Sequence, residues 1–132
     1  MLQLYPLRSN RSRAAGRGLA GWRVKRVAAF VEANIDSNIR VGDLAHIVLL
    51  STSHFCRAFK QTFGETPLRY ITRRRMHRAQ AIMLCSRDSL AKIAVDCGMC
   101  DQAHFSRAFR RIFGVNPGAW RSRVRTLATS PC

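Results

Sequence analysis

Acidic side chains are scarce in this chain of 132 residues, which has 7 Asp and Glu against 23 Lys and Arg and a formal net charge of +16 at pH 7. Most of the basic residues are arginines. A guanidinium is a planar fork of donors that fits phosphate oxygens and the edge of guanine. A charge balance this one-sided indicates a polyanionic partner, either nucleic acid or an anionic membrane surface.

Long apolar runs are missing as well. No stretch approaches the roughly 18 apolar residues that a helix needs to cross a bilayer. The first 21 residues contain four arginines and lack the continuous apolar segment of a secretory signal. We therefore expect neither export nor a membrane-spanning segment.

Sequence motifs of enzymes and metal sites are also lacking. We find no nucleophile elbow, phosphate-binding loop or paired metal motif. Cys97 and Cys100 form a single pair, whereas a structural zinc needs four ligands, so we interpret Cys97 as a buried thiol. His54 and His104 each stand apart from other metal-binding residues. We expect a protein that is not an enzyme, with no catalytic residue, metal or cofactor.

What the sequence does contain is a helical pattern that starts at Trp22. Apolar residues recur at steps of three and four, and no window alternates in the manner of a strand. The pattern predicts an all-α fold of about seven helices. The fourth helix is the longest, and its apolar stripe is expected to contain Leu68, Thr72, Met76, Ala79 and Met83.

An internal repeat at an offset of 50 residues is the most informative feature. Residues 54–67 match residues 104–117 at eight of fourteen positions, a similarity far beyond chance at this length. Each copy is a short helix, a turn and a second helix with a basic face, followed by glycine and proline. This is the layout of a helix-turn-helix, whose second helix enters the major groove of DNA.

The repeat suggests the boundaries of the parts. We expect a basic, disordered tail at 1–21, a DNA-binding domain at 22–124 and a C-terminal tail at 125–132. Within the domain we expect a first helix-turn-helix at about 41–63, a linker helix at about 67–84 and a second helix-turn-helix at about 90–113. Such a linker is about 27 Å long, close to one turn of B-DNA at about 34 Å. Two recognition helices carried by its ends are expected to enter adjacent major grooves.

Short motifs occur in a fixed order along these elements. They include Leu44-Ala45, Thr66-Pro67, Ile93-Ala94 and a long run from Asp101 to Arg111. From Trp22 to Val124 the sequence resembles the DNA-binding domain of the AraC/XylS family of bacterial transcription regulators. The resemblance implies a cytoplasmic bacterial regulator that reads double-stranded DNA with two recognition helices and contacts RNA polymerase.

The resemblance also implies roles for individual residues. The expected base-reading residues are Ser53, Cys56 and Arg57 in the first recognition helix and Gln102, Ala103, His104 and Arg107 in the second. Arg57 and Arg107 suit guanine, and Gln102 suits adenine. The expected phosphate contacts are Ser51, Lys60, Arg73, Arg74, Arg110 and Arg111. For the arginine run that begins at Arg73, a solvated helix face is an equal alternative.

The sequence departs from the family pattern at a few positions. Leu49 stands in the first turn, where the family often has glycine, which predicts backbone strain. Met99 stands in the second turn, where the family usually has phenylalanine. Ser53, Cys56 and Ala103 are small where the family often has larger polar residues, which predicts either a narrower base readout or a shift toward van der Waals contact with thymine methyl groups.

Two expectations concern partners. Only about 21 residues precede the DNA-binding part, so we expect no small-molecule effector domain in this chain. The alternative functions are a basic helical module that binds nucleic acid through charge alone and a helix bundle that binds a membrane surface or a protein partner.

Overall fold

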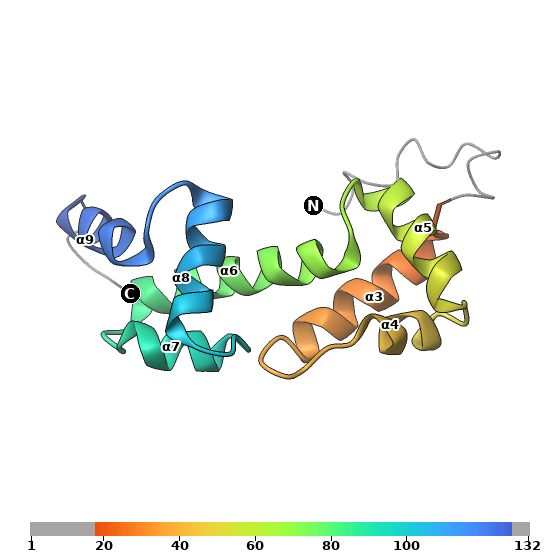
Figure 1. Ribbon diagram of the computed structural model, residues 1–132, viewed down its shortest axis with the longest axis horizontal. Coiled ribbons are helices and arrows are strands. Elements are labelled where there is room, and N and C mark those ends of the chain that lie inside the picture. Colours follow the sequence, from red (N-terminus) through yellow and green to blue (C-terminus); the bar gives the residue numbers. More distant parts are fainter. Residues whose placement is uncertain (1–17, 128–132) are drawn as a thin grey trace. The chain divides into compact units, whose positions relative to one another are not determined.

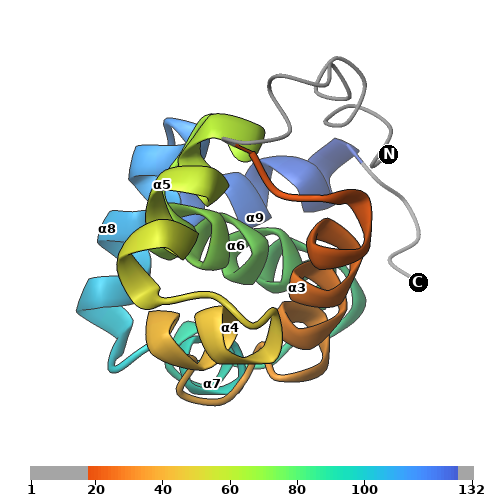
Figure 2. The same cartoon turned by 90° about the vertical axis from the view of Figure 1, so that its right-hand side faces the viewer.

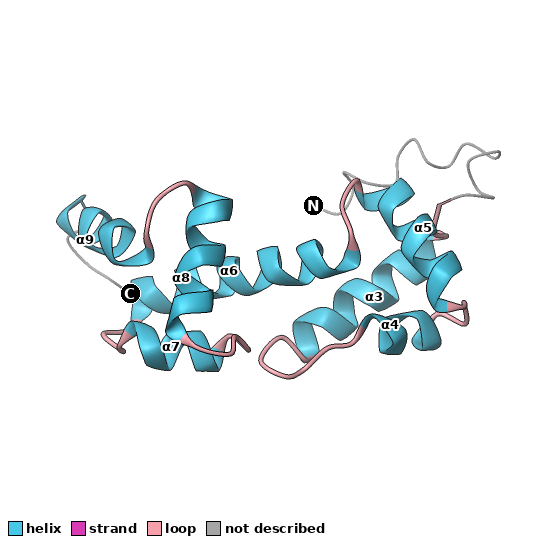
Figure 3. Cartoon of the chain, in the orientation of Figure 1, coloured by secondary structure: helices cyan, strands magenta, loops and turns pink. Residues whose placement is uncertain are grey.

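The computed structural model describes residues 18–127, and these residues form seven α-helices and no strand (Figures 1 and 3). The helices are α3 (Gly21–Ala33), α4 (Val41–Ile47), α5 (Thr52–Phe63), α6 (Pro67–Cys85), α7 (Leu90–Asp96), α8 (Gln102–Phe113) and α9 (Pro117–Leu127). The all-α class predicted from the sequence is confirmed. The parts of the expected tails at 1–17 and 128–132 lie outside the described residues.

The chain divides into two compact units. Within the described residues, unit 1 consists of residues 18–34 and 39–71, and unit 2 consists of residues 35–38 and 72–127. Helix α6 begins in unit 1 and ends in unit 2. Each unit contains one helix-turn-helix, formed by α4 and α5 in unit 1 and by α7 and α8 in unit 2.

In unit 1, α4 packs against both α3 and α5 (Figure 2). The buried side chains include Val27, Val31, Leu44, Val48, Phe55 and Phe59. The rings of Phe59 and Phe63 stack at 4.1 Å, and Tyr70 from the first turn of α6 meets Phe59 edge-on at 5.5 Å. This aromatic cluster fixes α5 to the helix that follows it.

Unit 2 repeats this arrangement fifty residues later. Its core contains Met76, Ala79, Met83, Ile93, Ala94, Cys97, Met99, Phe105, Ala108 and Phe109. Phe109 lies 4.7 Å from Phe113 and meets Trp120 of α9 edge-on at 5.9 Å. Trp120 therefore packs α9 against α8 in the way that Tyr70 packs α6 against α5.

The expected apolar stripe of the linker helix is wrong at its start. Leu68 is 62% exposed, whereas Tyr70 and Ile71 are buried. The reason is that α6 serves two cores in succession. Its first turn faces the core of unit 1, and only the stripe from Met76 onward belongs to unit 2.

The expected tail boundaries are also wrong by a few residues. Leu19 was assigned to a disordered tail, but its side chain is buried and its amide donates to Thr62 Oγ1 at 2.7 Å. At the other end, α9 continues to Leu127, and Arg125 donates to the carbonyl of Ser86. Burial of one leucine and a hydrogen bond thus extend the folded part beyond the limits that periodicity alone suggested.

A guanidinium holds the loop that leads into each helix-turn-helix. Arg75 on α6 donates from Nε to the carbonyl of Ile35 at 3.0 Å and from a terminal nitrogen to the carbonyl of Ser37. Arg125, fifty residues later, donates to the carbonyl of Ser86. Ser37 and Ser86 each stand three residues before the N-cap of the first helix of a helix-turn-helix. The repeat therefore extends beyond the fourteen residues with evident sequence identity.

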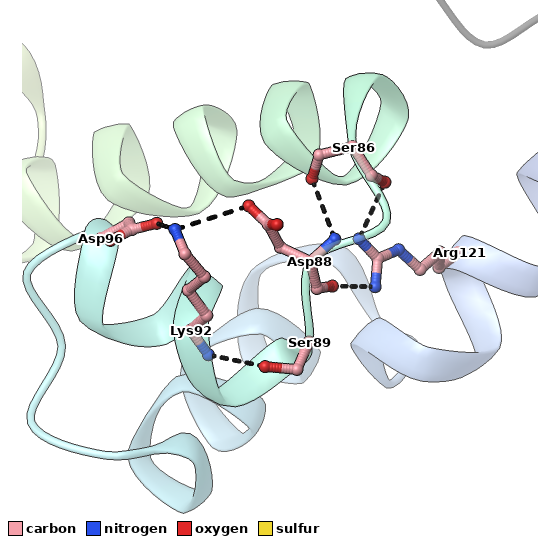
Figure 4. A network of polar contacts seen from close by, with 6 residues as sticks. All are labelled: Ser86, Asp88, Ser89, Lys92, Asp96 and Arg121. Carbon is pink, nitrogen blue, oxygen red and sulfur yellow. Dashed lines mark hydrogen bonds and ion pairs between the residues drawn. The ribbon is translucent and has the colours of Figure 1, made fainter.

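The loop before α7 is held by further contacts (Figure 4). Arg121 donates to the carbonyls of Asp88 at 2.7 Å and Ser86 at 3.2 Å. Lys92 Nζ lies 2.8 Å from a carboxylate oxygen of Asp96 and 3.6 Å from one of Asp88. These contacts fix where α7 begins, and so position the second helix-turn-helix.

Candidate nucleic-acid interface

Helix α5 is capped at both ends. Ser51 Oγ accepts a hydrogen bond from the amide of His54 at 3.2 Å, which satisfies one of the free donors of the first turn. Gly64 ends the helix in a left-handed conformation with φ of 77°. Phe55 and Phe59 face the core, so the opposite side of the helix is left to solvent.

Helix α8 is built in the same way. Asp101 Oδ1 accepts from the amide of His104 at 2.8 Å, and Gly114 ends the helix with φ of 78°. A carboxylate is a favourable cap because it also neutralises the positive end of the helix dipole. Phe105 and Phe109 are buried.

Burial follows the repeat position by position. Each of the nineteen residues from 51 to 69 has the same burial class as the residue fifty positions later. The two units therefore present the same helix face to solvent, although the residues on that face differ.

Most of the predicted base-reading residues lie on this exposed face. Ser53 and Arg57 are exposed on α5, while Cys56 is half-buried between them. Gln102, Ala103, His104 and Arg107 are all exposed on α8. The structure thus leaves most of each predicted set open to solvent on one helix, with Ala103, His104 and Arg107 on the side of α8 away from the phenylalanines and Gln102 at the start of the helix.

The predicted phosphate contacts fall into two groups. Ser51, Lys60, Arg110 and Arg111 are exposed at or on the two recognition helices. Arg110 Nη1 lies 3.4 Å from Asn116 Oδ1, a long contact that leaves the guanidinium available to other acceptors.

Arg73 and Arg74 lie instead on α6, where both are half-buried. Burial lowers the pKa of the neighbouring His77, and the charges of Arg74 and Arg73 lower that pKa further. The ring of His77 meets Phe113 edge-on at 5.3 Å. These arginines create a positive potential on α6, but they do not belong to either recognition helix.

Both turns close with the same hydrogen bonds. The amides of Leu49 and Leu50 donate to the carbonyls of His46 and Ala45, each at 3.0 Å. The amides of Gly98 and Met99 donate to Val95 and Ala94 at 3.0 and 2.9 Å. This is the Schellman pattern, which needs a left-handed residue at its centre. The strain predicted for Leu49 is confirmed by its φ of 61°.

Sequence reasoning missed Ser106. It stands fifty residues after Cys56, is half-buried in the same way, and lies on the same side of its helix. Applying the offset of the repeat to every candidate on the first helix would have found it. Ser106 is therefore the counterpart of Cys56 on α8.

The cysteines do not form a metal site in the part of the chain that the structure describes. Residues 18–127 contain no group of three or more His, Cys, Asp and Glu side chains that could hold a metal ion. Cys97 is buried as expected, and burial raises the pKa of its thiol to about 11. The thiol therefore stays protonated near neutral pH, which suits a core residue rather than a metal ligand.

The chemistry available on the two faces is that of hydrogen-bond donors on rigid supports. Arg57 and Arg107 supply charged forks, and Gln102 supplies both a donor and an acceptor. Phe55, Phe59, Phe105 and Phe109 are fully buried in the two cores, so their rings are not free to stack on bases. Among the described helices, none is long and apolar enough to span a bilayer.

Comparison with known proteins is consistent with this geometry. A family model described as a helix-turn-helix domain matches residues 44–123. The chain is similar to the probable transcriptional regulator LumQ of Photobacterium leiognathi, with 31% identity over 74 residues that cover 56% of this chain and 30% of that protein. The chain thus matches less than a third of the length of that relative.

Solved structures show the same fold. A transcriptional regulator with an AraC-type DNA-binding domain from Chromobacterium violaceum is 29% identical, with a TM-score of 0.72 and coverage of 76% of this chain and 90% of that one. The DNA-binding domain of AdpA, a global transcriptional factor solved in complex with a target DNA, is 26% identical. Its TM-score is 0.77, with coverage of 82% of this chain and 97% of that one.

Proposed function

Because this chain belongs to the helix-turn-helix family, as an AraC-type DNA-binding domain, we propose that it binds specific sites on double-stranded DNA and regulates transcription. The observation that carries the proposal is the pair of matched faces. Each of two capped helices buries two equivalent phenylalanines and turns polar residues outward at equivalent positions, within a stretch of nineteen residues whose degree of burial repeats. A protein that bound nucleic acid through charge alone would not need two helices with equivalent exposed faces.

The proposed readers act on base edges. Arg57 and Arg107 each make paired hydrogen bonds to O6 and N7 of guanine, and Gln102 makes paired bonds to adenine. The small side chains of Ser53 and Ala103 allow the helix backbone to approach the groove closely, where contact with thymine methyl groups becomes possible. Cys56, Ser106 and His104 complete the two faces.

The proposed phosphate contacts set position and orientation rather than sequence. Ser51 still has its hydroxyl hydrogen to donate, because its oxygen accepts from His54. Lys60, Arg110 and Arg111 contribute charge along the recognition helices. If about six phosphates are neutralised, the logarithm of affinity falls with the logarithm of salt concentration at a slope near −5.

Helix α6 sets the proposed reach along the DNA. Its 19 residues correspond to about 28 Å, and one turn of B-DNA is about 34 Å. We infer that the two recognition helices occupy successive major grooves on one face of the duplex. RNA polymerase is the proposed protein partner, and the cytoplasm of a bacterium is the proposed location.

The second candidate function is binding to any nucleic acid through charge, which the net charge of +16 favours. A competition experiment separates the two. A duplex enriched from a random pool should stay bound in a large excess of random duplex, and should be displaced by unlabelled copies of itself. Equal displacement by both competitors would contradict the proposed function.

A further inference from the structure

We propose that Arg40 is a phosphate contact of unit 1 with no counterpart in unit 2. The inference rests on the proposed binding to DNA and adds a residue that neither the repeat nor the reading faces include. The two copies differ at the residue before the first helix of each helix-turn-helix.

In unit 2 that residue is a good cap. Ser89 precedes α7, has an extended backbone, and its Oγ accepts from the amide of Lys92 at 3.1 Å. In unit 1 the equivalent residue is Arg40, with a similarly extended backbone but no side-chain cap bond. The residue before the helix thus has an extended backbone in both copies, but only unit 2 has a side chain there that caps the helix.

Arginine is a poor choice for this position in the free protein. A guanidinium has donors only, so it cannot accept a bond from the amides of the first turn. Its positive charge also lies near the positive end of the helix dipole. A residue that breaks the capping preferences of a helix, with no neighbouring contact to offset the cost, is typical of a functional position, where a bound ligand supplies that contact.

The surroundings of Arg40 do not compensate for it. Its side chain is exposed and forms no hydrogen bond or ion pair with any residue between 18 and 127. Asp43 lies in the first turn of α4 but makes no ion pair with it. Other arginines of the fold, such as Arg23 and Arg75, are tied to backbone carbonyls. The guanidinium of Arg40 is therefore available to an external anion.

The position of α4 places this charge beside the reading helix. A β-carbon added to Gly42 would lie 3.8 Å from Thr52 Oγ1, so the first turn of α4 lies against the first turn of α5. In helix-turn-helix proteins the N-terminal residues of the recognition helix meet the bases while the preceding helix crosses the DNA backbone. A long cation at this point is well placed to reach a phosphate that flanks the bases read by α5.

The test is Arg40→Ser in the full chain, which installs the residue that unit 2 uses. We expect opposite effects on two measurements. The midpoint of thermal unfolding should rise, because a cap is restored. Affinity for the selected duplex should fall about three- to tenfold at low salt, and the salt slope should become shallower by about 0.9.

Two control variants make the result specific. Arg40→Lys keeps the charge and should keep the salt slope. Lys25→Ser removes the same charge from an exposed position on α3 and should change the slope much less. An unchanged slope in Arg40→Ser, or an equal loss of slope in Lys25→Ser, would overturn the proposal.

The result also separates this inference from the function on which it rests. A wild-type protein that does not prefer the selected duplex over random competitor contradicts both proposals. A wild-type protein that does prefer it, with a salt slope that Arg40→Ser leaves untouched, contradicts only the role of Arg40.

Discussion

Leu49 and Gly98 occupy the same left-handed position in the two turns, with φ of 61° and 80°. Glycine adopts this conformation without steric cost, whereas a side chain with a β-carbon does not. Leu49 is 76% exposed, so little packing offsets the strain. The site of Gly98 has no room for a side chain, because a β-carbon there would lie 2.8 Å from the carbonyl oxygen of Ile35 and 3.0 Å from the guanidinium of Arg75.

We therefore expect Leu49→Gly to stabilise the protein by about 1 kcal/mol. Gly98→Ala should destabilise it by more than that, because left-handed strain and a close contact with backbone act together. Urea denaturation of both variants measures the two effects. A less stable Leu49→Gly would mean that the exposed leucine makes contacts that outweigh its backbone strain.

Replacing a base reader should differ from replacing a phosphate contact. Arg107→Ala is expected to lose about 1–3 kcal/mol of binding free energy and to relax selectivity at one base pair. Lys60→Ala should weaken binding to all sequences by a similar factor and make the salt slope shallower by about 1. Binding to a panel of single-base variants of the selected duplex measures both. If the two variants give the same uniform loss, Arg107 reads no base.

The environment of His77 predicts a dependence of stability on pH. Its pKa in the folded protein is lowered from 6.5 by burial and by Arg74 and Arg73. The unfolded chain therefore binds the proton more tightly, so stability is full above pH 6.5 and falls as the pH drops through the lower folded value.

Two measurements check this expectation. In an NMR titration, the ring of His77 should have a midpoint below 6.5. The loss of stability between about pH 7.5 and about pH 5.5 should be smaller in His77→Gln than in the wild type. An equal loss in both proteins would assign the acid sensitivity to other groups.

Two substitutions of Asp101, the N-cap of the second recognition helix, should separate the effect of the cap on stability from the effect of its negative charge on DNA binding. Asp101→Ala removes the bond to the amide of His104 and is expected to lower stability by about 1 kcal/mol. Asp101→Ser keeps a cap and removes a negative charge from the DNA-facing end. We expect Asp101→Ser to retain stability within about 0.5 kcal/mol and to bind DNA more tightly at low salt. Weaker binding by Asp101→Ser would point to a direct role for the carboxylate.

Much of the candidate site follows from the repeat in the sequence. The caps at Ser51 and Asp101, the glycines that end α5 and α8, and the buried phenylalanines all depend on local chemistry and helical period. These features are local, so the sequence alone predicts them. The strain at Leu49 could be predicted for the same reason.

The features that the sequence did not predict depend on tertiary packing. Leu68 was placed in a core because one stripe was assumed for α6, whereas the helix faces two cores in turn. Leu19 and Arg125 are held by contacts with residues more than thirty positions away. The missing cap at Arg40 becomes evident only when it is compared with Ser89, and the second copy has an extra residue in its turn that hides this equivalence.

Selection of bound duplexes from a random pool, repeated with Arg57→Ala and Arg107→Ala, tests the central claim most directly. The wild type should enrich a motif in two halves whose centres are about 10 base pairs apart. Each variant should relax one half and leave the other intact. Enrichment of no motif, or loss of the same positions in both variants, would contradict an account in which two matched helices read two successive grooves.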